Sequence, residues 1–585
     1  MRLVEIRLLE GPNVYRLEPT IKLEVGVGRR RSWYGQRLPG RHATIRLGAT
    51  VPSRDWPDEV ALLTGWVRRL RLDGGEGVGG LAVHRSSEPG IWIVTAPWTG
   101  AGRARAIADA AFELAAKGVS PTRRVQLTGG QARLLERSLE RIRGADATPP
   151  AWIRDAERRM PAISISGTNG KSTVSRLVSH ILAAAGHRVG TTTSDGVYVD
   201  ERLVEPGDWT GPGGAAQVLR RTDVDVAVLE TARGGILLRG VGYETNEASV
   251  LTNVSSDHLD LQGIHTLPEL AEVKATICRM TRPDGWVVLN ADDPLVAAVA
   301  RRVRAQVALF SIAGDRVARY RRHIAGGGRG YTVRDGRIVE DDDGRATALI
   351  ELREIPIALG GLARHNVANA LAATAGARGL GADIAAVAHG LRDFRPTAER
   401  SPGRLNLYRL GDRIVIVDFA HNEAGIAAIL DVAEGIASGA AGRAMPITAI
   451  VGTAGDRPDD TLRGIGRIAA GRAQRVAIKE TLGYLRGRTR EHVVGELLAG
   501  IVEGGGDPAT VAVYGSEAVA IRAELERGPA GSDGRAPQGR VIVLMCHEDR
   551  AGVQAALESL GARPVDVATE LTSLVPRLRA GPIRA

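Results

Sequence analysis

The chain has 585 residues, of which 44% are hydrophobic and 25% charged, so it can form several hydrophobic cores and wholesale disorder is excluded. Its two cysteines, Cys278 and Cys546, lie far apart in the sequence, which excludes a disulfide framework and a cysteine zinc site and favours a reducing compartment. Since no apolar run reaches the ~18 residues of a membrane span and the first residues lack a signal-peptide core, we expect a cytoplasmic protein with no membrane partner.

The formal net charge is +10, and the kind of basic residue is more informative than the total. Only five of the 77 basic residues are lysine, a skew that we interpret as a coding bias that scatters arginine over the surface. Two short arginine clusters, at 29–31 and 319–322, are too small for a base-stacking platform, so nucleic acid is not an expected partner. A lysine that remains in such a chain is expected where a compact ammonium or a nucleophilic amine is needed.

The first part of the chain, residues 1–145, has the pattern of an α+β domain. Short β-like runs at 3–8 and 91–94 alternate with Gly- and Pro-rich turns, and helices are expected over 103–117 and 131–143. Residues 146–160, which include two consecutive prolines, are typical of a linker.

From residue 161 onward, apolar strands alternate with helical segments, which predicts an α/β fold with parallel sheets. The first series of strands is expected at 162–166, 224–231, 248–253, 286–290 and 306–311, with hairpin connections at 326–330 and 341–344. After a break near 396–402, the second series is expected at 413–418, 447–451, 475–478, 510–514 and 540–545. We therefore expect a central α/β domain at 161–398 and a Rossmann-like C-terminal domain at 399–585.

The most specific signal is the run from Ile163 to Thr173, in which a β-branched strand enters a glycine-containing loop and a helix follows. Such glycines let backbone N–H groups converge on phosphate oxygens, and the helix adds the positive end of its dipole. Lys171 would reach the β- and γ-phosphates of ATP, and the Ser172 hydroxyl would ligate Mg²⁺. The strict GxxxxGK[ST] pattern is not met, because Ile165 replaces its first glycine, and the alternative is a plain turn before a helix. The residues expected to bind nucleotide here are Gly167, Thr168, Asn169, Gly170, Lys171, Ser172 and Thr173.

This loop resembles the GTNGK[TS] loop of the Mur ligases and folylpolyglutamate synthetases. Further matching stretches begin at Gly190, Val204, Leu229, Val288 and Lys479. The resemblance is greatest to the Mur-ligase-like half of cyanophycin synthetases, over about residues 161–550, and residues 9–15 resemble the opening of those proteins. It implies a central P-loop domain, and a reaction in which ATP activates a carboxylate as an acyl phosphate before an amine is coupled to it.

The resemblance also implies a catalytic and metal-binding set. Glu230 ends a predicted strand, at the sheet edge where ligands bind, and a carboxylate there can hold Mg²⁺. His258 matches the family's metal-binding histidine, and Lys274 matches a lysine that is carbamylated and helps to set the Mg²⁺. With Ser172, these residues would serve two Mg²⁺ sites, and with Lys171 they form the expected catalytic set. The alternatives are a surface carboxylate, a structural histidine and an ordinary helix cation.

Three further residues match positions that bind the rest of ATP in the family. Asn366, in an HNxxN motif, would read the adenine edge, Arg404 would clamp phosphate, and Asp418 would accept from a ribose hydroxyl. The alternatives are a helix cap, a surface arginine and a turn-forming aspartate. Phe419 and Glu423 replace the tyrosine and proline of the family's D-Y-A-H-N-P motif, so the resemblance does not imply the family's shape for this loop.

We therefore expect an ATP-dependent ligase that couples an amino acid or other amine to a peptide-like or amino-acid carboxylate. Two alternatives stay open: another P-loop hydrolase, although the guanine-reading N-K-x-D is lacking, and a regulatory scaffold with a relic nucleotide site. Cyanophycin synthetases carry an ATP-grasp domain between their two resembling parts, whereas here only one helix and a linker intervene, which predicts one ATP site. The N-terminal domain would either help to hold the acceptor or form a homo-oligomer contact.

Overall fold

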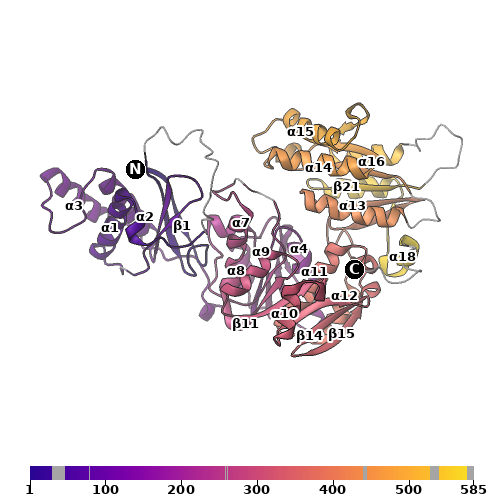
Figure 1. Ribbon diagram of the computed structural model, residues 1–585, viewed down its shortest axis with the longest axis horizontal. Coiled ribbons are helices and arrows are strands. Elements are labelled where there is room, and N and C mark those ends of the chain that lie inside the picture. Colours follow the sequence, from indigo (N-terminus) through magenta and orange to yellow (C-terminus); the bar gives the residue numbers. More distant parts are fainter. Residues whose placement is uncertain are drawn as a thin grey trace.

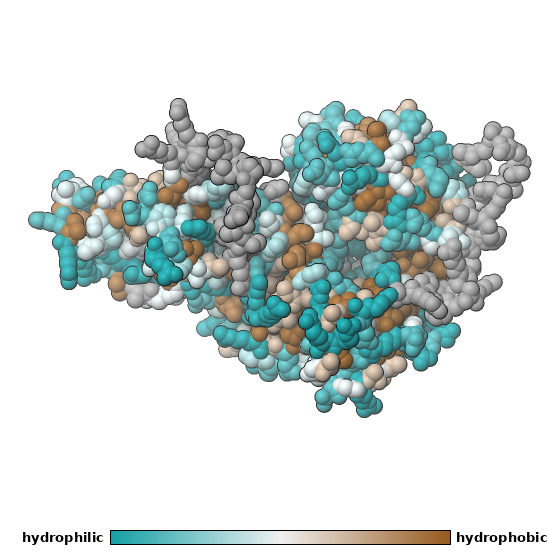
Figure 2. Space-filling model, viewed as in Figure 1, coloured by the Kyte–Doolittle hydropathy of each residue, from teal (hydrophilic) through white to brown (hydrophobic). Residues whose placement is uncertain are grey.

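The computed structural model describes residues 1–28, 47–77, 79–256, 259, 261–438, 445–527 and 539–575. Three sheets follow one another along the chain, and each is covered by helices. The N-terminal part forms one end of an elongated molecule (Figure 1). Hydrophilic residues cover most of the face in Figure 2, and hydrophobic residues appear there in small patches. Within the described ranges, no helix combines the length and apolar character needed to cross a membrane.

The first sheet is antiparallel and has the strand order β1-β2-β4-β3. Its elements are β1 (Arg2–Leu9), β2 (Thr20–Gly26), β3 (Ala82–Arg85) and β4 (Ile91–Pro97), with α1 (Asp58–Asp73), α2 (Ala101–Ala116) and α3 (Gly129–Arg143). The two helices expected from the sequence are confirmed as α2 and α3. Helix α1 was not predicted, although its buried Val60, Leu63, Val67 and Leu70 recur at helical spacing.

The second sheet has eleven strands in the order β15-β14-β13-β12-β11-β10-β5-β9-β6-β7-β8. Its strands are β5 (Ala162–Ser166), β6 (Val189–Thr192), β7 (Gly196–Val199), β8 (Arg202–Pro206), β9 (Val226–Glu230), β10 (Asn246–Leu251), β11 (Thr281–Asn290), β12 (Gln306–Ser311), β13 (Arg329–Arg334), β14 (Arg337–Asp342) and β15 (Arg345–Glu351). The five predicted strands of this series are confirmed as β5, β9, β10, β11 and β12, and they run parallel. Two strands that were not predicted, β6 and β13, extend the parallel part, and both edges of the sheet are antiparallel hairpins.

Of the two hairpin connections predicted near β13, one is confirmed by the structure and one is not. The acidic turn at 341–344 joins β14 to β15, which confirms the predicted hairpin. The prediction for 326–330 was wrong, because this stretch ends helix α10 (Ala318–Ala325) and leads into β13. Glycine past a helix C-terminus and glycine in a hairpin give the same local signal, and only the preceding helix separates the two cases.

Helices cover both faces of the second sheet. One face packs against α4 (Lys171–Ala184), α11 (Arg364–Gly379) and α12 (Ile384–Asp393). The other face lies against α5 (Pro212–Leu219), α6 (Arg233–Leu238), α7 (Leu267–Lys274), α8 (Thr276–Arg279), α9 (Pro294–Ala297) and α10. This is the doubly covered parallel sheet in which ligands bind at the carboxyl edge of the strands.

The segment that follows β1 ties the first part of the chain to the second sheet. The Glu10 amide donates to the Arg239 carbonyl at 2.6 Å, and the Val241 amide donates to the Pro12 carbonyl at 2.8 Å. Val14 is buried in the same hydrophobic cluster as the helices of the second sheet. The first sheet is therefore joined to its neighbour by backbone hydrogen bonds as well as by side-chain packing.

The third sheet has the order β20-β19-β18-β21-β17-β16-β22, and β17 to β21 run parallel. Its strands are β16 (Asn406–Leu410), β17 (Arg413–Asp418), β18 (Ile447–Val451), β19 (Arg475–Lys479), β20 (Ala512–Tyr514), β21 (Val541–Met545) and β22 (Arg563–Pro564). Helices α13 (Glu423–Ala437), α14 (Asp459–Arg472), α15 (Arg490–Glu503) and α18 (Val567–Leu574) cover one face, and α16 (Glu517–Glu526) and α17 (Arg550–Ser559) cover the other. This Rossmann-like arrangement agrees with the predicted fold class, although β20 is shorter than expected because Pro508 opens a 3₁₀ turn.

Candidate functional site

A cavity of about 870 Å³ lies between the second and third sheets and is lined by residues from both. It brings together most of the residues that the sequence singled out, namely Thr168, Asn169, Gly170, Lys171, Ser172, Thr173, Glu230, Lys274, Asn366, Arg404 and Asp418. Gly167 directly precedes this lining in the chain. His258 lies outside the described residues, as do residues 29–31 of the first arginine cluster, so both stay predictions.

The loop between β5 and α4 has the backbone shape that a phosphate cradle needs. Gly167 has φ +154° and Gly170, the N-cap of α4, has φ +87°. A Cβ at Gly167 would lie 1.8 Å from Thr252 Oγ1, and one at Gly170 would lie 2.3 Å from Asn369 Oδ1. Both positions therefore require glycine because of their conformation or the close approach of neighbours, and the N–H groups at the start of α4 stay free of side-chain obstruction.

The segment after β10 stabilises the loop through hydrogen bonds. The sequence analysis did not identify this role. Asn253 Oδ1 accepts from the Asn169 amide at 2.9 Å, and Asn253 Nδ2 donates to the Asn169 carbonyl at 3.0 Å. Thr252 Oγ1 donates to the same carbonyl at 2.7 Å. The sequence signal for Asn253 is its position at the end of the strand predicted at 248–253, at the edge where ligands bind.

Lys171 and Ser172 occupy the first turn of α4. Lys171 Nζ donates to the Thr168 carbonyl at 3.0 Å, so its ammonium is folded over the loop. Ser172 Oγ lies 3.3 Å from Ser194 Oγ, which follows β6. Both residues line the cavity at the N-terminus of α4, where an anion is stabilised by the helix dipole.

Glu230 and Lys274 lie close to this loop and are buried. Glu230 Oε2 has no hydrogen-bond partner among the described residues, and burial raises the pKa of this carboxyl while Lys171 opposes the rise. An orphaned buried carboxylate oxygen is costly unless a cation or a proton reaches it, so this atom suits a divalent ion. Lys274, the last residue of α7, donates from Nζ to the Gly167 carbonyl at 2.7 Å.

The predicted adenine reader, Asn366, lies in the first turn of α11 with its side chain buried. Its Nδ2 donates to the Ile357 carbonyl at 3.2 Å, and its Oδ1 accepts from Asn369 Nδ2 at 3.0 Å. One amide hydrogen and one lone pair remain after these bonds, which is the donor–acceptor pair that a base edge needs.

Arg404 and Asp418 approach the cavity from the third sheet. Both oxygens of Asp418 accept backbone N–H groups at 2.8 Å, from Leu405 and from Ala420. Burial raises the pKa of Asp418, and the Arg404 guanidinium opposes this rise. Arg404 Cζ lies 4.1 Å from the Phe419 ring centroid, so the phenylalanine that replaces the family's tyrosine supports the guanidinium. Glu423 begins α13 after the N-cap Asn422, which is a position where proline is also common.

Two polar contacts join the third sheet to the phosphate loop and its surroundings. Asn422 Nδ2 donates to Asn169 Oδ1 at 3.1 Å, and Asn169 Nδ2 donates to Asn422 Oδ1 at 3.4 Å. Asp195, in the turn after β6, pairs with Arg176 at 2.9 Å and with Arg550. Burial alone would raise the pKa of Asp195, but Arg404, Arg550 and Arg176 hold it at about 2. The sequence analysis did not single out Arg550, since nothing local marks it among so many arginines.

The cavity carries more basic than acidic groups. Besides Lys171, Lys274, Arg404 and Arg550, its lining includes Arg233, Arg457 and Arg486, against four carboxylates: Asp208, Glu230, Asp293 and Asp418. Arg457 and Arg486 belong to the loops after β18 and β19, and Arg486 pairs with Asp456. This excess suits ligands that carry several negative charges, such as a nucleoside triphosphate and a carboxylate.

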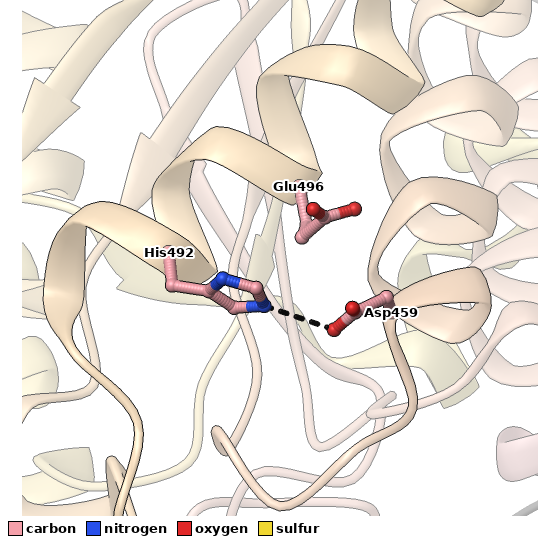
Figure 3. A group of neighbouring side chains, drawn as sticks. All are labelled: Asp459, His492 and Glu496. Carbon is pink, nitrogen blue, oxygen red and sulfur yellow. Dashed lines mark hydrogen bonds and ion pairs between the residues drawn. The ribbon is translucent and has the colours of Figure 1, made fainter. Parts of the chain in front are cut away.

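A second group that could hold a metal ion lies outside this lining, between the start of α14 and α15 (Figure 3). His492 Nε2 lies 3.0 Å from Asp459 Oδ1, and Glu496 stands one helical turn further along α15. Arg488 also donates to Asp459, and Arg463 donates to Glu496 at 2.5 Å. Because cations already neutralise both carboxylates, we interpret the group as an ion-pair network that joins the two helices.

The fold and the cavity together define an α/β protein in which a loop with the backbone shape of a phosphate cradle lies at the edge of one parallel sheet and a second α/β unit faces it. Residues 165–377 match the family described as the Mur ligase middle domain. The middle part of the chain is therefore similar to a Mur ligase middle domain.

Two curated relatives and one solved structure are similar to the chain. The chain is 39% identical over 348 residues to the cyanophycin synthetase of Crocosphaera subtropica, a match that covers 60% of this chain and 39% of that protein. It is 30% identical over 335 residues to the UDP-N-acetylmuramoyl-L-alanyl-D-glutamate–2,6-diaminopimelate ligase of Alkalilimnicola ehrlichii, covering 56% of this chain and 62% of that protein. The chain thus matches about two-fifths of the length of the cyanophycin synthetases. A Mycobacterium tuberculosis folylpolyglutamate synthase complexed with ADP and AMPPCP is 22% identical, with a TM-score of 0.49 over 70% of this chain and 93% of that one.

Proposed function

We propose that the chain is an ATP-dependent ligase that activates a peptide-like or amino-acid carboxylate as an acyl phosphate and couples it to an amino acid or other amine. The observation that carries the proposal is the single cavity in which the phosphate loop faces Arg404, Asp418 and Arg550 of the third sheet. Such a cavity can hold ATP at one sheet edge and present the γ-phosphate to a second substrate. The relatedness to ligases supports the same reaction class.

The proposed mechanism gives each residue a place relative to ATP. Asn366 contacts the adenine, Asp418 accepts from the ribose, and the start of α4 with Lys171 binds the phosphates. The substrate carboxylate attacks the γ-phosphorus, so that its O–P bond forms while the bond to the ADP oxygen breaks. The amine nitrogen then attacks the acyl carbon, and inorganic phosphate leaves with the C–O bonding electrons. Lys171 and Arg404 stabilise the charge on the transferring group.

The residues present fit Mg²⁺, because an orphaned Glu230 oxygen and the Ser172 hydroxyl both line the phosphate loop. In the proposal Ser172, Glu230 and His258 hold the ion, a carbamylated Lys274 completes the set, and two ions are bound in total. When bound, Mg²⁺ supplies positive charge that neutralises phosphate oxygens.

The test is a phosphate-release assay with the full chain, ATP, Mg²⁺ and a panel of amino acids and short acidic peptides. We expect release that depends on adding a carboxylate and an amine together, with mass spectrometry showing the amide product. Tight nucleotide binding without release from any pair would instead favour the regulatory scaffold. An exposed-lysine variant, Lys117→Ala, serves as the control, since Lys117 is exposed at the end of α2, where it pairs with Glu113.

A further inference from the structure

A buried ion pair at the carboxyl edge of the third sheet is left unused by the proposed mechanism. Lys479 is the last residue of β19 and Glu517 is the first residue of α16. Lys479 Nζ lies 2.7 Å from Glu517 Oε1, and their side chains are 0% and 1% exposed. A fully desolvated pair is costly to form, so it is informative to ask which other groups it holds.

Glu517 holds the segment that leads into α17. Its carboxylate accepts the backbone N–H groups of His547, Glu548 and Asp549, the last at 2.9 Å. Three successive amides converging on one anion form a nest, which fixes the backbone at that point. The next residue in the chain is Arg550, the first residue of α17, which reaches across to Asp195 beside the phosphate loop.

Lys479 holds the side chain of His547. Its Nζ lies 2.7 Å from His547 Nδ1, and His547 Nε2 lies 2.8 Å from the Ala420 carbonyl. Because an ammonium only donates and a carbonyl only accepts, Nδ1 accepts and Nε2 donates, which fixes one neutral tautomer and one ring orientation. The edge of this ring packs on Phe419, with centroids 5.1 Å apart.

Phe419 connects the ring of His547 to both arginines. The guanidinium carbon of Arg404 lies 4.1 Å from the Phe419 centroid, and that of Arg550 lies 5.1 Å from it. The Lys479–Glu517 pair is therefore connected to Arg550 in two ways, through the backbone that Glu517 binds and through His547 and Phe419. It is connected to Arg404 through His547 and Phe419. Neither Lys479 nor Glu517 lines the cavity, whereas His547, Phe419 and both arginines do.

We propose that Lys479 and Glu517 are positioning residues, which hold Arg404 and Arg550 toward the phosphate loop without touching the nucleotide. The proposal rests on the proposed function, in that it assumes that the cavity binds ATP. The backbone after β18 approaches this lysine closely, since a Cβ at Gly452 would lie 3.0 Å from Lys479 Cε and 2.1 Å from the Lys479 carbonyl oxygen.

The test measures binding of a non-hydrolysable ATP analogue with Mg²⁺ by calorimetry. The variant is Lys479→Met with Glu517→Gln, which removes both charges together so that no buried charge is left alone. The matched control is Arg475→Met, because Arg475 is the first residue of the same strand and pairs at 2.8 Å with Glu524 of the same helix, α16. Circular dichroism and thermal unfolding confirm that each variant is folded at the assay temperature.

We expect the Lys479/Glu517 variant to bind about tenfold more weakly or worse, the scale of one misplaced charged hydrogen bond. Arg475→Met should lose thermal stability but keep the affinity. In a background with Arg404→Met and Arg550→Met, removing the pair should cost no further affinity, because its effect passes through these two arginines.

Wild-type affinity in the folded pair variant would overturn the proposal, and so would an equal, additive loss in the background that lacks both arginines. A folded wild-type chain that binds no analogue at all would overturn the proposed function, and the positioning role with it.

Discussion

Among the charged residues of the cavity, Lys171 allows the most direct test of the proposed phosphate chemistry. Its ammonium donates to the Thr168 carbonyl of the phosphate loop, and the proposed mechanism places the transferring phosphoryl group beside it. Lys171→Ala should therefore lower substrate-dependent phosphate release by on the order of 10²–10³ or more. The assay is compared with Lys117→Ala at equal folded concentration. Near wild-type release from the Lys171 variant would contradict the phosphate-loop assignment.

Lys274 tests a different chemistry at the same loop. Arginine keeps the charge but cannot form a carbamate, so Lys274→Arg should be folded and inactive in phosphate release. Lys274→Ala should regain part of its activity when a small carboxylate is added, because that anion replaces the missing carbamate. Full activity of the arginine variant would reduce Lys274 to a cation that donates to the Gly167 carbonyl.

The residues of the cavity differ in how far the sequence could predict them. Lys171 and Lys274 stand out because lysine is rare in this chain, and Glu230 because it ends a buried strand. Arg550 and Asp195 carry no comparable local signal, since their importance comes from a contact between segments 355 residues apart. Sequence patterns report the local chain, whereas this pair is created by the packing of two sheets.

Among the elements, periodicity predicted the alternating strands and helices of both α/β parts. It missed α1, whose apolar residues follow a region of short β-like runs, and it missed β6, β7 and β8 at one edge of the second sheet. The edge strand β8 is exposed throughout, whereas the central strand β9 is buried throughout, so the apolar run that marks a central strand is lacking in β8. The expected domain boundaries at 145, 160 and 398 stay predictions.

The two ends of α4 offer a matched pair of glycine substitutions. Gly170 and Gly186 have φ +87° and +89°, so alanine is strained at both by about 1–2 kcal/mol. A Cβ at Gly186 meets nothing within 4 Å, whereas one at Gly170 lies 2.3 Å from Asn369 Oδ1. Gly170→Ala should lose nucleotide affinity by calorimetry and unfold at a lower temperature than Gly186→Ala. Equal affinities in the two variants would show that the loop tolerates a side chain.

The first sheet contains a histidine that makes stability depend on pH. His84 in β3 is 1% exposed. Its Nδ1 donates to the Ala49 carbonyl, and its Nε2 accepts from the Thr95 hydroxyl. Burial lowers the pKa of His84 to about 4. Because the unfolded chain binds this proton near pH 6.5, stability is complete above that pH and falls as pH drops toward 4, by up to about 3 kcal/mol. Urea unfolding at pH 7.5 and 5.0 should show a smaller difference for His84→Gln than for wild type. The exposed His187→Gln should behave as wild type, and an unchanged difference in the His84 variant would contradict this role.

Across the whole molecule, both neighbours of the second sheet contact it through polar and apolar groups. The third sheet contacts the phosphate loop and its surroundings through the Asn169–Asn422 amide pair and the Asp195–Arg550 ion pair, and its hydrophobic cluster includes Leu359 and Ala363. The N-terminal part contributes Val14 and Leu47 to a cluster of the second sheet and joins it by backbone hydrogen bonds. Because the cavity lies between the second and third sheets, motion on substrate binding is expected between these two.

The last prediction concerns the number of bond-forming sites in this 585-residue chain. Between α3, which ends at Arg143, and β5, which begins at Ala162, the structure describes only a linker with a short 3₁₀ turn, so no ATP-grasp domain fits there. We therefore expect one nucleotide bound per chain in calorimetry. Incubated with ATP, Mg²⁺, aspartate and arginine alone, the pure chain should make no two-residue-repeat polymer, because a carboxylate acceptor made by another enzyme is needed. Mass spectra that show a lengthening Asp–Arg polymer without a supplied primer would contradict the single-site proposal, and a stoichiometry near two would contradict it independently.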